Sequence, residues 1–442
     1  MYSTNLIKAI QTKVNSASTS EEVFYLSEAI RKLNLGVVKT VVTYADLQTF
    51  NAKNGDVVFV EDEEALYFSV LGVGWVKIFS VGVLSAFGWG LGSFGRLGDN
   101  NATNRSLPVS VVGGFTDWIQ VVGGSAHSLG LRENGTAWGW GRSFYGVMGD
   151  GVGASSWSSP VAVVGGFTDW IQLSTRGNHS LGLRANGTAW SWGNNQYGVL
   201  GGGVVGGNRN SPESVVGGFT DWSQLSGGSL HSLGLRSNST AWAWGLNTSG
   251  QLGDNSTTSR ASPVSIVGGF TDWIQLSAGG RHSIGLRVNG TTWAWGNNID
   301  GQLGDNSTTV RSSPVSVVGG FTDWVQVSAG FSHSLGLRSN GTAWAWGLNT
   351  NGQLGDNSTT GKSSPVSVVG GFTDWVQLDG GGAHSLALRA NGTIWSWGNG
   401  AYGKLGDNTA VGKSSPVSVI DGAVGWVQVS ANPNHNTGVR AG

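Results

Sequence analysis

At 442 residues, the chain is long enough for two or three ordinary domains, or for one large repeat architecture with an appendage. It contains 75 Gly and 22 Trp but only 12% charged residues, and this composition favours strands, tight turns and packed aromatic side chains over helices. A formal net charge of -1 gives no broad attraction to nucleic acid, and the lack of Cys excludes disulfides and thiolate metal sites.

The first part of the chain, residues 1–36, has a helical pattern. Apolar residues recur at three- and four-residue intervals in 7–14 and again in 23–33, which predicts two short amphipathic helices. Thr19 with Glu22 fits a capping box for the second helix, and Gly36 fits its end. Because helices this short are unstable alone, we expect them to serve attachment or oligomerisation.

Residues 37–80 predict a small β-meander. The segments VVFV (57–60), LYFSV (66–70) and WVKIF (75–79) are rich in β-branched and aromatic residues, as strands are. The acidic run Glu61 to Glu64 between the first two strands is interpreted as a solvated turn, with metal binding as the weaker alternative.

A repeat of about fifty residues fills residues 81–442. Trp followed by Gly recurs in seven copies spaced by 51 or 52 residues, and all seven histidines keep the same spacing. Because each type has one equivalent place per copy, we expect both to be structural repeat positions. The tryptophans are Trp89, Trp140, Trp192, Trp244, Trp295, Trp346 and Trp397, and the histidines are His127, His179, His231, His282, His333, His384 and His435.

Each copy contains four short strand patterns. In one copy these are SPVSVV (313–318), DWVQVS (323–328), HSLGLR (333–338) and TAWAWG (342–347). Asn340-Gly341 joins the last two and predicts a tight hairpin turn with positive φ angles. Four antiparallel strands in a unit of this length are typical of a propeller blade.

The two ends of the repeat region complement each other. The last copy ends with HNTGVRAG (435–442) and lacks its TAWAWG strand, whereas the first copy opens with LSAFGWG (84–90) and has no HSLGLR before it. We therefore predict that the N-terminal strand completes the C-terminal blade, which removes exposed strand edges. The predicted fold is mainly β, a seven-bladed β-propeller with four-stranded blades, preceded by a small helical plus β-meander module.

The repeated motifs WGxNxxGQLGD, SPV, DWxQLSAG and HSLGLRxNGTxWxWG resemble those of the regulator of chromosome condensation repeat family, especially its bacterial and viral members. The resemblance covers residues 83–442 and implies a seven-bladed propeller with interlocked ends. It implies little about activity, because a fold does not determine a function. Residues 5–80 resemble, more loosely, segments of virion structural proteins of tailed phages.

No motif predicts catalysis, a cofactor or a metal site. Each histidine is followed by Ser, or by Asn436 in the last copy, so the histidines form a ring of hydrogen-bonding positions and do not converge on a metal. The Asp residues before Trp, such as Asp323 and Asp374, are expected to bond to nearby backbone. The GDNSTT loops are interpreted as turns, with calcium binding as the weaker alternative.

Loops that depart from the repeat are the candidate ligand-binding sites, because loops on a rigid scaffold carry specificity and exposed aromatic rings suit sugars or protein anchors. Neutral drift of loops that contact nothing is the alternative, and a shallow site repeated between adjacent blades is another. The candidate residues are Arg142, Phe144, Tyr145, Trp157, Tyr197, Arg209 and Tyr402.

These observations predict a non-enzymatic virion protein of a tailed phage, made in the host cytoplasm. Residues 1–80 are expected to bind other virion proteins and to form a homo-oligomer such as a trimer, while the propeller binds a host surface glycan or protein. No nucleic acid and no membrane insertion are expected, because the chain has no basic excess and no long apolar segment. The alternatives are a purely architectural virion protein and an intracellular exchange factor for a small GTPase.

Overall fold

The computed structural model describes residues 83–442 except 154, 421 and 422, together with the backbone of four strands between residues 39 and 80. The chain divides into two compact units, one of Met1–Val83 with Ala441–Gly442 and one of Leu84–Arg440. The two helices predicted in residues 1–36 and the acidic turn Glu61 to Glu64 lie outside the described residues.

The N-terminal unit contains one four-stranded sheet in the order β1-β2-β3-β4. The predicted meander is present as β2 (Val57–Val60), β3 (Ala65–Val70) and β4 (Gly74–Ser80), which pair antiparallel. The short strand β1 (Lys39–Val41) adds a parallel edge to β2, with Thr40 opposite Phe59. Three residues are too few to show the alternation that would have predicted β1.

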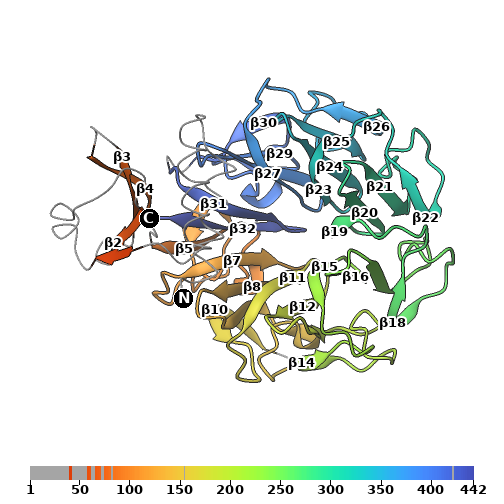
Figure 1. Ribbon diagram of the computed structural model, residues 1–442, viewed down its shortest axis with the longest axis horizontal. Helices are drawn as coiled ribbons and strands as arrows, with labels where there is room; N and C mark the ends of the chain where they lie inside the picture. Colours follow the sequence, from red (N-terminus) through yellow and green to blue (C-terminus); the bar gives the residue numbers. More distant parts are fainter. Residues whose placement is uncertain are drawn as a thin grey trace. The chain divides into compact units, whose positions relative to one another are not determined.

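The second unit is a seven-bladed propeller of four-stranded sheets, as the repeat predicted (Figure 1). The first strands of the blades are β7 (Trp118–Gly123), β11 (Trp170–Thr175), β15 (Trp222–Gly227), β19 (Trp273–Ala278), β23 (Trp324–Ala329), β27 (Trp375–Gly380) and β31 (Trp426–Ala431). The second strands are β8 (His127–Arg132), β12 (His179–Arg184), β16 (His231–Arg236), β20 (His282–Arg287), β24 (His333–Arg338), β28 (His384–Arg389) and β32 (His435–Ala441).

The third strands are β9 (Ala137–Arg142), β13 (Ala189–Gly193), β17 (Ala241–Gly245), β21 (Thr292–Gly296), β25 (Ala343–Gly347), β29 (Ile394–Gly398) and β5 (Leu84–Gly90). The fourth strands are β10 (Ser156–Ala162), β14 (Arg209–Ser214), β18 (Arg260–Ser265), β22 (Arg311–Ser316), β26 (Lys362–Ser367), β30 (Lys413–Ser418) and β6 (Arg105–Ser110). We number the blades from β7–β10 as blade 1 to β27–β30 as blade 6; blade 7 contains β31, β32, β5 and β6.

The Ser-Pro strand forms the outer edge of each blade. It follows the Trp-Gly strand, so the blade begins with the Asp-Trp strand and ends with the Ser-Pro strand of the next sequence copy. Pro314, for example, lies in β22, which pairs only with β21. An edge strand tolerates proline because the missing N–H would have faced away from the sheet.

Ring closure uses two N-terminal strands, which corrects the prediction of one. Blade 7 has the order β31-β32-β5-β6, and in Figure 1 the orange β5 lies beside the dark-blue β32. The closing unit is larger because the Ser-Pro strand that follows β5 remains with it, with Phe87 opposite Ser110. Two strands from each end of the repeat region therefore make this blade.

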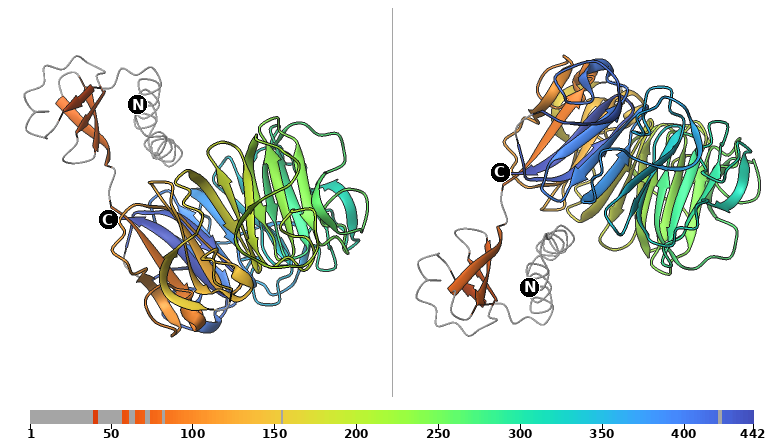
Figure 2. Two further views of the ribbon diagram at one scale, coloured as in Figure 1. Left: turned by 90° about the horizontal axis from the view of Figure 1, so that it is seen from below. Right: turned by 90° about the horizontal axis from the view of Figure 1, so that it is seen from above.

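Seven similar hydrophobic clusters hold neighbouring blades together. Between blades 4 and 5, Leu286 and Leu303 of blade 4 pack against two tryptophans of blade 5, Trp324 and Trp346, whose ring centroids are 6.0 Å apart. Burying such a side chain stabilises the fold by about 2–3 kcal/mol. Figure 2 shows the blade sheets packed face to face around the ring. All seven tryptophans that precede Gly in the repeat are fully buried.

The Asp residues before Trp form ion pairs, which corrects the prediction that they bond to backbone. Asp323 accepts a hydrogen bond from Arg338 at 2.9 Å, and the guanidinium of Arg338 lies 4.3 Å from the ring centroid of Phe321. In the hairpin turn after Arg338, only Gly341 has a positive φ, of 73°. The end of the blade that contains these groups we call the turn face.

Candidate ligand-binding surface

The opposite end of each blade carries the long loops. The loop between the third and fourth strands hydrogen-bonds to the turn between the first and second strands, as in the bond from Asn297 N to Arg281 O at 2.9 Å. These turns and loops together form what we call the loop face. Because each loop also packs on the next blade, the junction between two blades on this face is a seam.

The loops of blades 3, 4 and 5 use their polar groups internally. In blade 4, Asp305 accepts hydrogen bonds from Asn298, Ser307 and Arg311. The Asn298 side chain also donates to the backbone carbonyls of Ser307 and Thr309. The loop is thus a closed turn, and within the residues that the structure describes no group of three or more His, Asp or Glu could hold a metal ion.

The loops of blades 6, 7, 1 and 2 are different. In these four loops, the glycine of the first short turn is preceded by an aromatic residue. In blades 3 to 5, the residue before the equivalent glycine is Ser, Asp or Asn. Three of these aromatic residues have positive φ angles, namely Phe94 (65°), Tyr145 (71°) and Tyr402 (65°). Such angles strain a bulky side chain, and strained positions persist where the surrounding structure holds them.

Three of the predicted loop residues gather in one pocket. Arg142, Phe144 and Tyr145 line a cavity of about 250 Å³ at the seam between blades 1 and 2, together with Ala126, His127, Val147 and Asn178. The guanidinium of Arg142 lies 4.5 Å from the ring centroid of Phe144 and 4.8 Å from that of Phe94. Phe144 is 45% exposed, so an aromatic and basic surface faces solvent here.

The pocket has positive charge without a local counterion. Arg96, which is buried, donates to Ser93 O and to Ser125 O at 2.9 and 2.8 Å. Burial and, to a smaller extent, the neighbouring Arg142 together lower the pKa of Arg96 to about 10. Among the ion pairs of the described residues, none includes Arg96 or Arg142.

The other predicted loop residues lie outside this pocket. The Trp157 indole is 40% exposed but donates to Asp150 at 3.0 Å. Arg209 forms an ion pair with Glu213 in its own strand. Tyr197 lies in the loop of blade 2, and Tyr402, 48% exposed, lies in the loop of blade 6.

The seven histidines form a closed hydrogen-bonded ring in the interior. His282 Nε2 lies 3.0 Å from Ser334 Oγ of the next blade, and that hydroxyl donates to Gln302 O at 2.8 Å. The serine proton is therefore used, so His Nε2 must be the donor; burial keeps the imidazole neutral. Burial lowers the pKa of His282 to about 3. The same bond joins each blade to the next, with Asn436 replacing Ser after His384.

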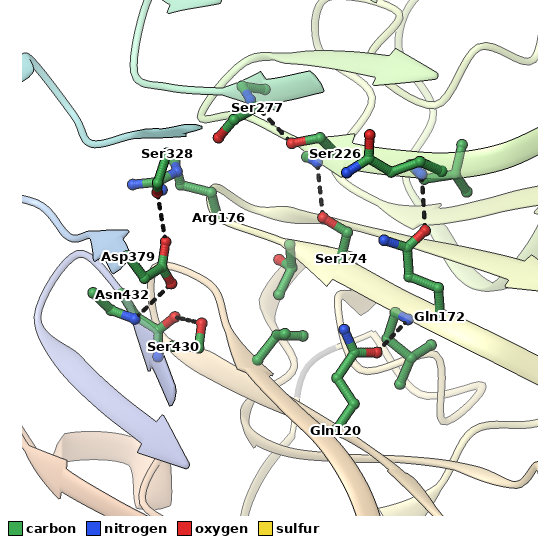
Figure 3. A pocket seen from close by; sticks show the side chains of 18 of the residues that line it. Gln120, Gln172, Ser174, Arg176, Ser226, Ser277, Ser328, Asp379, Ser430 and Asn432 are labelled. Atoms are coloured by element: carbon green, nitrogen blue, oxygen red, sulfur yellow. Dashed lines mark hydrogen bonds between the residues drawn. The ribbon is translucent and has the colours of Figure 1, made fainter. Parts of the chain in front are cut away.

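A polar channel runs through the centre of the ring, with a cavity of about 270 Å³ (Figure 3). One glutamine per blade bridges to the neighbouring inner strand; Gln172 Oε1, for example, accepts from Leu225 N at 2.8 Å. The equivalent bonds close a complete circle of seven. Serines two residues further on make a second set, as Ser226 Oγ does with Ala278 N.

Two charged residues interrupt this channel, and the sequence analysis missed both. Arg176 stands where five blades have Gly, and Asp379 stands where most blades have Ser. Arg176 Nη2 donates across the channel to Ala329 O at 2.6 Å and Gly380 O at 2.8 Å. Asp379 accepts from Ser328 Oγ and Ala431 N, both at 2.8 Å. Comparing equivalent positions between copies would have found this pair.

Burial lowers the pKa of Arg176, and the nearby Asp379 opposes this. Burial raises the pKa of Asp379, and Arg176 opposes that rise. Each charge is therefore supported by the other across the channel.

In the described part of the chain, no helix is long and apolar enough to cross a membrane.

Comparison with known proteins agrees with this architecture. The RCC1-like domain family matches residues 158–442, and the regulator of chromosome condensation repeat matches residues 85–131 and 118–147. The chain therefore belongs to the RCC1-like propeller family.

Two similar proteins differ greatly in how much of their length is covered. The ultraviolet-B receptor UVR8 of Arabidopsis thaliana is 28% identical over 369 residues, covering 79% of this chain and 82% of the receptor. The probable E3 ubiquitin-protein ligase HERC6 of Homo sapiens is 33% identical over 64% of this chain but only 28% of its own length.

Solved structures show the same fold. Prp20p of Saccharomyces cerevisiae, described with its binding properties to Gsp1p and histones, aligns with a TM-score of 0.73 and 22% identity, covering 82% of this chain and 92% of that one. Human WBSCR16 aligns with a TM-score of 0.72 and 20% identity, covering 81% and 99%. At these identities the similarity establishes the fold alone.

Proposed function

We propose that this protein is a non-catalytic recognition protein, whose propeller binds a glycan or protein on a host surface through its loop face. The observation that carries the proposal is the pocket formed by Arg142, Phe144 and Tyr145. These residues stand in a loop that departs from the repeat, on a scaffold that the inter-blade clusters hold rigid. Exposed aromatic rings beside an unpaired guanidinium are suited to binding and provide no nucleophile or general base.

The proposed setting is the virion of a tailed phage, with residues 1–80 attaching the propeller to other virion proteins and forming a homo-oligomer. The support for this setting is the resemblance of residues 5–80 to segments of phage structural proteins. The recognition role and the virion setting are separable, because the pocket belongs to the propeller unit alone.

The test is binding of the fluorescently labelled full-length protein to candidate host cells. We expect saturable binding that unlabelled protein competes away and that a Tyr145→Ser variant reduces about tenfold. The matched control is Ser249→Ala, at the equivalent place in blade 3, which should bind like the original protein. Absence of binding to every candidate cell would favour a purely architectural role.

Exchange of nucleotide on a small GTPase is the second candidate function. Its support is membership of the RCC1-like family and the fold shared with Prp20p, for which binding to Gsp1p is described. The measurement is the release rate of a fluorescent guanine nucleotide from a small GTPase. Acceleration by substoichiometric protein would favour exchange activity over surface recognition.

A further inference from the structure

Basic and aromatic residues occur together at three consecutive seams of the loop face, and this arrangement deepens the proposed function. At the seam of blades 6 and 7, Tyr402 and Lys404 stand in one loop, and at the seam of blades 7 and 1, Phe94 and Arg96 stand in the equivalent one. The third seam, between blades 1 and 2, is the pocket with Arg142. We call these three seams the basic arc.

The other loops carry a neutral residue at the position of Arg96 and Lys404; in blade 1 this residue is Val147, and the basic residue there is Arg142 at the end of β9. Gln251, Gln302 and Gln353 replace the basic residue at the seams from blade 3 to blade 6. Each of these glutamines accepts a hydrogen bond from its own loop, as Gln302 Oε1 does from Asp300 N at 2.9 Å. At the seam of blades 2 and 3, Val199 takes the place and Tyr197 keeps the aromatic ring. Within the loops between third and fourth strands and the strand ends that precede them, the two residue types occur together in blades 6, 7 and 1, whereas Arg281 and Phe331 lie in the turns between first and second strands of blades 4 and 5.

The arc provides exposed ring faces above buried positive charge. Phe94, Phe144 and Tyr402 are 44%, 45% and 48% exposed, whereas Arg96 and Lys404 are only 3% and 4% exposed. No ion pair of the described residues includes Lys404, so its charge, like that of Arg96, is not neutralised by a carboxylate. Fixed positive charge in a partly desolvated seam attracts anions more strongly than an exposed lysine does.

We propose that the basic arc binds an acidic polysaccharide, with sugar rings stacked on the exposed aromatic side chains and a carboxylate or sulfate group at Arg142, while the buried Arg96 and Lys404 add positive potential beneath the surface. A repeating polymer matches a site that is repeated from seam to seam, and several weak contacts then combine. Arg142 makes the direct contact, because it is the one basic residue of the three that is not buried.

The same chemistry favours a glycan over single-stranded nucleic acid. A nucleic acid carries a charge on every nucleotide, and its binding proteins line the path with several accessible cations. Here two of the three cations are buried and cannot follow a phosphate backbone. The inference rests on the proposed recognition function of the loop face, and its test separates the two.

The test measures binding of the full-length protein to immobilised alginate, a polyuronate, beside dextran, poly-glutamate and poly-dT, at low and high salt. We expect binding to alginate, weakened by salt, and little binding to the other three polymers. Arg142→Gln should weaken the alginate affinity about tenfold, since it removes a charge-assisted contact. Tyr402→Ser, which introduces the residue type of Ser249, should weaken it about threefold.

The matched control is Arg281→Gln, because Arg281 is an exposed arginine in a loop-face turn of blade 4, outside the basic arc. It should leave the affinity unchanged, and thermal unfolding of each variant checks that the propeller remains folded. Equal binding to dextran, or preference for poly-glutamate or poly-dT, would overturn the acidic-glycan inference while leaving a recognition function in place. Failure to bind any of the polymers and any host cell would contradict both proposals.

Discussion

At the scale of single residues, the histidine ring shows how one side chain per repeat can link all the blades. Each imidazole donates from Nε2 to a hydroxyl or amide of the next blade, which leaves Nδ1 free of a proton. Nδ1 has no hydrogen-bond partner in six of the seven. Protonating one of these imidazoles would create a buried positive charge that has no counterion. It would lie next to a hydroxyl whose proton is already donated to a backbone carbonyl.

We therefore expect stability to fall with acidification. Burial lowers the pKa of six of the histidines to about 3 or 4 and that of His435 well below its usual range, while the unfolded value is near 6.5. Between these values the unfolded chain binds more protons, so each histidine removes about 1.4 kcal/mol of the unfolding free energy per pH unit as the pH falls. The measurement is urea unfolding at pH values from about 7 to about 4.

A His282→Gln variant provides the control. Unfolding of this variant should take up one proton fewer than unfolding of the original protein. Its unfolding free energy should therefore depend less steeply on pH across the same range. An unfolding free energy that stays flat from about pH 7 to about pH 5 in the original protein would contradict the neutral ring.

At the scale of secondary-structure elements, the inner strands and their turns carry a charged departure from cyclic symmetry inside the channel. Arg176 follows β11 in blade 2, yet its hydrogen-bond acceptors are at the ends of β23 and β27. Asp379 is the penultimate residue of β27 and holds blade 7 by accepting a hydrogen bond from Ala431 N. The pair thus ties blade 2 to the opposite side of the ring, in addition to the glutamine circle.

A double-mutant cycle tests this coupling. Arg176→Gly alone should cost about 3–5 kcal/mol of unfolding free energy, because Asp379 would remain buried without its cation. Asp379→Ser alone should be similarly destabilising. The double variant carries the residue types found at these places in most other blades, so we expect it to recover much of the loss.

The unfolding free energies of all four proteins can be measured by urea titration. Strictly additive losses in the double variant would show that the two charges do not support each other.

At the scale of the whole molecule, closure of the ring depends on segments that are far apart in the sequence. Phe87 and Trp89 of β5 pack against Trp426 of β31, with ring centroids 5.1 and 5.9 Å from it. Without β5 and β6, β32 would become an exposed edge and this cluster would lose two of its three aromatic side chains.

Two truncations should behave differently. Removing residues 1–82 leaves every propeller strand in place, so we expect a folded protein with an unchanged unfolding midpoint. Removing residues 1–110 also takes β5 and β6, and we expect it to abolish the cooperative transition or cause aggregation. Circular dichroism melting and size-exclusion chromatography distinguish these outcomes. Equal stability of the two fragments would disprove closure by the N-terminal strands.

The sequence by itself determined the repeat, the number of blades and the residues that face the core, because these follow from local alternation within strands such as Trp324–Ala329 and from copy-to-copy comparison. It also identified Arg142, Phe144 and Tyr145, because a departure from the repeat is visible without a structure. Only the tertiary structure decided that these three share a pocket and that Phe94 belongs with them.

The tertiary structure alone also decided that two N-terminal strands close the ring and that Arg176 approaches Asp379. Such contacts join segments that are adjacent only once the ring is closed, and no local pattern of side chains encodes which positions will meet across it.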